Sequence, residues 1–108
     1  MTPANNQKRI PVLWLPESGK PAEWKTVHAM PVNIRRPGWK NVEVLTYRRA
    51  EVVFVVHGPT GINLTYGATS ALALKNFYDA TAKLTAHDFE EVMKSAFETG
   101  HYPPKPVL

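Results

Sequence analysis

The chain has 108 residues, of which 44% are hydrophobic and 20% charged, and its formal net charge at pH 7 is +4. This length fits one domain, and this composition is too apolar for an intrinsically disordered protein. Because the sequence contains no cysteine, it excludes a disulfide-stapled secreted scaffold, a thiolate metal site and a cysteine nucleophile.

The two ends of the sequence are expected to lie outside the packed part of the domain. Residues 1–8 are polar and predict a flexible N-terminus without the apolar core of a signal peptide, and residues 101–108 (HYPPKPVL) predict an extended Pro-rich tail. No apolar run approaches the roughly 18 residues that cross a bilayer. We therefore expect a single domain over residues 1–108 that is cytoplasmic and has no membrane contact.

Two strands are predicted before the first strong turn. The run 10–15 (IPVLWL) is apolar and bounded by turn-forming residues, and Pro11 within it indicates an edge strand, because proline cannot donate to a ladder. The second candidate spans 26–34, where Pro31 again indicates an edge or a bulge.

Three further strands are predicted after the turn at 36–39 (RPGW). The first spans 42–47. The next spans 52–57 (VVFVVH), whose β-branched and aromatic residues lack polar alternation and predict burial on both faces in the interior of a sheet. The tight turn 57–61 (HGPTG) then leads into a fifth strand over 62–66.

The hydrophobic period changes from two to about 3.6 after Gly67. A first helix is predicted over about 69–84, capped by Thr69 or Ser70. Its apolar stripe includes Phe77, which we expect to face the sheet.

A second helix is predicted over about 86–98, where Thr85 and Asp88 form a variant capping box. The fold class is therefore α+β, with a small antiparallel β-sheet of about five strands within residues 10–66 packed against a C-terminal αα-hairpin. The order of the strands is left open.

Charge is distributed unevenly along the chain. Residues 1–50 carry nine Lys or Arg against three Asp or Glu, whereas residues 51–108 carry four against six. This asymmetry favours a negatively charged partner, although a basic surface is also a common aid to solubility. The candidate partner-binding residues are basic or aromatic: Arg35, Arg36, Trp39, Lys40, Tyr47, Arg48 and Arg49.

Arginine forks suit phosphates, and exposed aromatic rings offer a stacking surface for bases, so the expected partner is nucleic acid or a nucleic-acid-associated protein. If residues 42–47 form a strand, the two halves of this set lie roughly 20 Å apart, at about 3.3 Å per residue. They form one patch only if the sheet twists or the chain forms a homodimer, which stays open. The competing interpretation places Trp39 on the core edge and makes the arginines solvated turn residues.

The four histidines are too dispersed to show metal-ligand spacing, so we expect no metal and no cofactor. His57 is the candidate for acid–base chemistry, because it ends a buried strand near Thr60 or Tyr66. A strand-end histidine is more often bonded to the backbone. The acids at the start of the second predicted helix, Glu90 and Glu91 among them, are explained as partners of the helix dipole.

Three classes of function follow. The favoured hypothesis is a small non-enzymatic binding module that uses its basic and aromatic sheet-and-loop surface. The alternative is a protein-only adaptor or inhibitor that binds through an exposed β-edge or the helical hairpin, with little dependence on salt. The second alternative is a small enzyme that uses His57.

Overall fold

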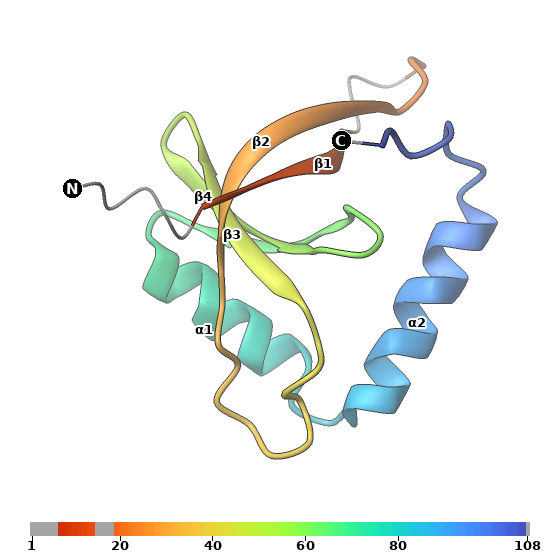
Figure 1. Cartoon of the computed structure of the whole chain (residues 1–108). Helices are drawn as coiled ribbons and strands as arrows, with labels where there is room; N and C mark the ends of the chain where they lie inside the picture. The colour runs from red at the N-terminus through yellow and green to blue at the C-terminus, as the bar shows by residue number, and fades with distance from the viewer. Residues whose placement is uncertain (1–6, 15–18, 108) are drawn as a thin grey trace.

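The computed structural model of the chain describes residues 7–14 and 19–107. A five-stranded antiparallel sheet is followed by two helices, which confirms the predicted α+β class (Figure 1). The strands lie in chain order, so each one pairs with its neighbours in sequence. The elements are β1 (Lys8–Trp14), β2 (Glu23–Pro31), β3 (Val44–Arg49), β4 (Val52–His57), β5 (Asn63–Gly67), α1 (Ser70–Ala80) and α2 (Ala86–Thr99). Within the described ranges, no helix is long and apolar enough to cross a membrane.

The two prolines predicted to mark edges have different outcomes. β1 is an edge strand, as Pro11 predicted, while Leu15, where that predicted strand ended, lies outside the described residues. β2 is an interior strand, so the edge predicted from Pro31 is wrong. Pro31 is tolerated because it is the last residue of β2, where only Met30 and Pro31 pair with β3.

The sheet bends at β2. The first part of this strand pairs with β1, and only its last two residues pair with β3, so that β1 crosses back over the other strands (Figure 1). The amide of Leu13 then donates to the carbonyl of Gly61, in the β4–β5 turn, at 2.7 Å. The sheet therefore curls until its first strand meets its last turn.

Two hydrophobic cores lie on opposite faces of β3 and β4, and the curl encloses one of them. The helix core lies under α1 and α2 and includes Trp39, Val44, Val53, Val55, Phe77, Phe89 and Met93. The inner core lies within the curl and includes Ile10, Val12, Ala29, Leu45, Tyr47 and Val56. Both faces of β4 are covered, which is why its sequence lacks polar alternation.

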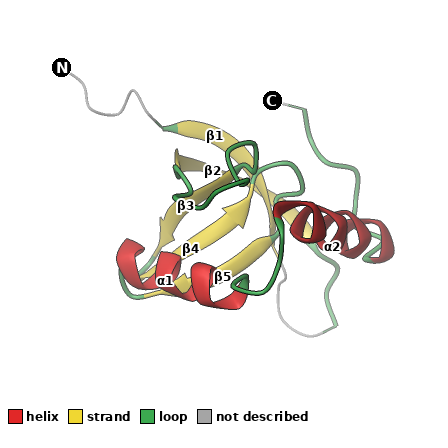
Figure 2. Ribbon diagram, turned by 90° about the horizontal axis from the view of Figure 1, so that it is seen from below, coloured by secondary structure: helices red, strands yellow, loops and turns green. Residues whose placement is uncertain are grey.

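The helices begin as predicted but do not lie side by side. Thr69 caps α1, and both hydrogen bonds of the capping box at the start of α2 are present. The helices meet where the rings of Phe77 and Phe89 are 5.9 Å apart, and from there they diverge (Figures 1 and 2). The predicted αα-hairpin is therefore splayed, because each helix packs its apolar residues into the helix core.

The segment after α2 is extended and returns towards the start of β2 (Figure 1). The indole nitrogen of Trp24 donates to the carbonyl of Pro103 at 2.9 Å, and the Lys105 ammonium donates to the carbonyl of Pro59 at 2.7 Å. Tyr102 packs against Phe97, with ring centroids 6.1 Å apart. The tail thus links α2 to β2 and to the β4–β5 turn.

Candidate functional site

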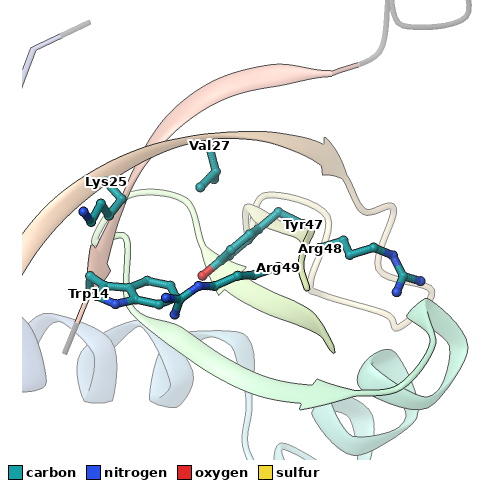
Figure 3. Close-up of a pocket in the computed structure, with 6 residues that line it drawn as sticks. All are labelled: Trp14, Lys25, Val27, Tyr47, Arg48 and Arg49. Atoms are coloured by element: carbon teal, nitrogen blue, oxygen red, sulfur yellow. The ribbon is translucent and has the colours of Figure 1, made fainter. Parts of the chain in front are cut away.

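A hollow of about 320 Å³ opens at the end of the inner core (Figure 3). We call it the basic pocket, and its lining residues come from β1, β2 and β3: Trp14, Lys25, Val27, Tyr47, Arg48 and Arg49. Three of these residues are cations, and no acid is among the described residues that line it. The site is therefore suited to an anionic ligand.

Arg49 is held in the basic pocket by stacking. Its guanidinium carbon lies 3.4 Å from the ring centroid of Trp14, which is a close cation–π contact. Trp14 is itself braced by an edge-to-face contact with Phe54, with centroids 6.5 Å apart. Arg49 takes part in none of the ion pairs found among the described residues, so its charge is not neutralised within this part of the chain.

Tyr47 forms the floor of the pocket. Its ring is buried and stacks on Phe54 at 5.4 Å, and its hydroxyl donates to Oδ1 of Asn63 at 2.8 Å. Burial raises the pKa of the Tyr47 phenol above its ordinary value, while the Asn63 hydrogen bond and the Arg49 charge act in the opposite direction. The phenol therefore stays protonated at neutral pH and donates its hydrogen bond to Asn63.

The other two cations differ in their orientation. Lys25 pairs with Glu23 at 3.2 Å, but both side chains are more than half exposed, so solvent weakens the pair and leaves Lys25 available. Arg48 points away from Trp14 (Figure 3), because neighbouring residues of a strand point to opposite faces. Lys25 and Arg49 therefore supply most of the charge at the pocket.

The predicted partner-binding residues do not form one patch within the chain. Arg35, Arg36, Trp39 and Lys40 lie in the loop between β2 and β3, whereas Arg48 and Arg49 end β3 at the turn into β4. The length of β3 separates the two groups, as the strand prediction implied. The basic pocket therefore brings together only the second group, and adds Trp14 and Lys25.

Trp39 and Tyr47 are not the exposed stacking surfaces expected of a binding site, and for Trp39 the competing interpretation, which packed it against the core, is confirmed. Trp39 is only 2% exposed and packs against Phe77 and Phe89, with centroid distances of 6.2 and 5.3 Å. Tyr47 is 4% exposed. Burial of large rings is strongly favourable, so both side chains serve mainly as core.

Arg36 anchors its loop to the end of α1. Its guanidinium donates to the carbonyls of Tyr78 and Thr81 at 3.1 and 3.2 Å, and to the Thr81 hydroxyl at 2.9 Å. It also lies 4.9 Å from the ring centroid of Trp39. A cation at the carbonyl end of a helix is stabilising, so these contacts give Arg36 a role in the fold.

His57 is buried and bonded on both ring nitrogens. Nδ1 lies 2.8 Å from Oγ1 of Thr60, and Nε2 lies 2.7 Å from Oε1 of Glu90. The ring also packs edge-on against Phe89. Both partners are side chains, so the expected bond from the ring to the backbone was wrong, whereas the expected position near Thr60 is present. Glu90, which was explained only as a partner of the helix dipole, also binds the His57 ring. This chain of contacts ties α2 to the end of β4.

A hollow of about 340 Å³ adjoins His57, but the ring itself is only 3% exposed. Burial lowers the pKa of His57 below the ordinary value, and Lys105 acts in the same direction, while Glu90 and Glu43 act against it. Within the described ranges, no group of three or more His, Asp or Glu is arranged to hold a metal ion. The residue is placed as a structural link between α2 and the sheet.

We predict that Arg36→Ala lowers the free energy of unfolding by about 1–3 kcal/mol, because it removes three hydrogen bonds from a charged donor. Chemical denaturation would measure the change. Arg35→Ala is the matched control, since Arg35 contacts Tyr78 through its backbone amide, which alanine keeps. Equal stability of the two variants would contradict the anchoring role.

We also predict that the His57 ring titrates below the ordinary histidine pKa of about 6.5. The unfolded chain then binds a proton that the folded chain excludes, so this residue lowers the free energy of unfolding as the pH falls from about 6.5 to the lower folded-state pKa. An NMR titration of the ring would measure the midpoint. Glu90→Gln should lower it further, because a favourable charge is lost, whereas a wild-type midpoint at or above 6.5 would refute the prediction.

Comparisons with protein-family models, with curated proteins and with solved structures gave no match. No relative therefore transfers residue roles to this chain.

Proposed function

We propose that the protein is a non-enzymatic binding module that binds nucleic acid through the basic pocket, with a backbone phosphate at Arg49 and Lys25. The observation that carries this proposal is the guanidinium of Arg49, stacked 3.4 Å from the centroid of Trp14. Within the described ranges, no carboxylate pairs with it. We further propose a cytoplasmic location, supported by the absence of cysteine.

Stacking suits Arg49 to a phosphate. A guanidinium is planar, and when its face lies on an aromatic ring, its N–H donors still point outwards in the plane. Phosphate oxygens accept such donors in pairs, with charge assistance. Lys25 adds a second cation at the same hollow, and the excess of basic residues in the N-terminal half attracts a polyanion over longer distances.

Strand addition by a protein partner has less support. On the open side of β1, Pro11 has no N–H to donate, and the Leu13 amide is already bonded to Gly61. At the other edge, the carbonyl of Tyr66 in β5 accepts from the side chain of Asn76. Both edges therefore offer fewer backbone groups than a pairing strand requires.

An enzyme using His57 also has less support. Both ring nitrogens are within hydrogen-bond distance of Thr60 and Glu90, and the ring is almost fully buried. A general base needs an accessible nitrogen within reach of its substrate. The position of His57 favours a role in holding α2.

We predict that Arg49→Ala and Lys25→Ala each weaken binding to a fluorescein-labelled single-stranded oligonucleotide by about tenfold, close to 1.4 kcal/mol. Each variant should also reduce the slope of log affinity against log salt by about 0.7, because one phosphate contact is lost. Fluorescence anisotropy at salt concentrations from about 50 to about 200 mM would measure both the affinity and the salt slope. Arg49→Lys keeps the charge but not the stacked fork, so it should bind less tightly than the wild type.

Arg35→Ala and Lys40→Ala are the matched controls, because both side chains are exposed and lie at the other end of β3. They should bind like the wild type apart from a small general effect of charge. If these loop variants lose as much affinity as Arg49→Ala, the basic pocket is not the binding site. If the wild type does not bind at low salt, the proposal fails.

A further inference from the structure

A second hollow, of about 250 Å³, adjoins the basic pocket. Its described lining consists of Leu13, Trp14, Arg49, Phe54, Ile62, Asn63 and Tyr102. Trp14 and Arg49 line both hollows, so the stacked pair forms the wall between them. One ligand can therefore touch both hollows while it contacts Arg49.

The lining of this second hollow is largely apolar and aromatic. Phe54 is fixed on three sides, since it stacks on Tyr47, meets Trp14 edge-on and lies 6.0 Å from the ring of Tyr66. Aromatic contacts of this kind hold ring orientations. The wall is thus preorganised for a flat, weakly polar group.

Asn63 adds an oriented amide to the hollow. Its Oδ1 accepts from the Tyr47 hydroxyl at 2.8 Å, which turns the amide and leaves Nδ2 with two donors. Among the described residues, no buried side-chain nitrogen or oxygen atom lacks a hydrogen-bond partner. The Nδ2 atom of Asn63 is therefore not an unsatisfied buried donor. An amide donor in an aromatic hollow suits a carbonyl oxygen or ring nitrogen on the edge of a nucleobase.

Tyr102 supplies the outer wall from the C-terminal tail. Its ring packs against Phe97, and the next residue, Pro103, is held by the indole of Trp24 at 2.9 Å. The tail therefore completes the hollow. Because Tyr102 lies outside the sheet and both helices, its side chain can be changed without disturbing either core.

We propose that this second hollow is a subsite for one unpaired base of a single-stranded nucleic acid whose adjacent phosphate occupies the basic pocket. The inference rests on the proposed function and adds the class of nucleic acid. Base and phosphate are neighbours in a nucleotide, as the two hollows are neighbours across Arg49. A duplex keeps its bases stacked inside, so it cannot fill the hollow without flipping a base out.

Three labelled probes of equal length test this subsite: an oligothymidylate, an oligomer in which every position is abasic, and a duplex. The abasic oligomer has the same number of phosphates as the oligothymidylate but no base. Because stacking on aromatic side chains contributes appreciably for each base, the oligothymidylate should bind at least tenfold more tightly than the abasic oligomer. It should also bind more tightly than the duplex in the same buffer.

Variants of the tail connect this preference to the second hollow. Tyr102→Ala should lower the ratio of the two single-strand affinities several-fold, because one of the aromatic walls is lost. Tyr102→Phe should restore the ratio, since the ring is kept. Val107→Ala is the matched control in the same tail, at a side chain that is 97% exposed, and thermal denaturation would check that each variant is folded.

The outcomes separate the two proposals. Equal affinity for the oligothymidylate and the abasic oligomer overturns the base subsite and leaves phosphate binding at the basic pocket intact. A preference for base-bearing strands that Tyr102→Ala does not change overturns the placement of the base in this hollow. Failure of all three probes to bind at low salt overturns the proposed function and this inference with it.

Discussion

The hydrogen bond from the Leu13 amide to the Gly61 carbonyl holds the end of β1 against the β4–β5 turn. This contact closes the curl around the inner core, next to Trp14, which lines both hollows. Gly61 has a φ of +72°, and a Cβ there would lie 2.8 Å from the carbonyl oxygen of Pro11. Only glycine combines an unstrained positive φ with the absence of a Cβ that would clash with β1. The close approach holds Leu13 at the turn, and the next residue, Trp14, packs against the inner core, where its ring forms the aromatic wall of the basic pocket.

Two arginines in similar surroundings use their hydrogen-bond donors differently. Arg36 and Arg49 each lie over a tryptophan ring, at 4.9 and 3.4 Å. The donors of Arg36 are used by the carbonyls at the end of α1 and by Thr81, so its charge stabilises the helix. Arg49 ends a strand at a turn, where the described chain places no carboxylate partner. Aromatic stacking alone therefore does not distinguish the two arginines. The difference lies in their hydrogen-bond donors, which Arg36 uses within the fold and for which the described residues show no acceptor at Arg49.

Most of the elements could be predicted because their signals are local. β4 coincides with the predicted strand 52–57, and the capping box predicted at Thr85 is present. α1 ends at Ala80, before the predicted end near 84, because Thr81 leaves the helical conformation, with a φ of −104°. The amides of Ala82 and Leu84 then donate to carbonyls three residues back, as in tight turns, and not four residues back as in an α-helix. The bend at β2 was not predicted, because pairing with two different strands leaves no pattern in the sequence of one.

The sequence by itself determined the α+β class, the order of the elements and the basic character of the N-terminal half, since periodicity, caps and charge are properties of neighbouring residues. Of the residues that line the basic pocket, it placed Tyr47, Arg48 and Arg49 among the candidates, but it did not single out Trp14 or Lys25. The alternation of Ile10, Val12 and Trp14 was the available signal that Trp14 faces inwards with the core. Only the tertiary structure decided that Trp39 is buried, that Glu90 bonds His57, and that the tail closes the second hollow. Each of these contacts joins residues that are distant in sequence. Such contacts depend on how the sheet curls and on which aromatic rings become buried when the chain folds.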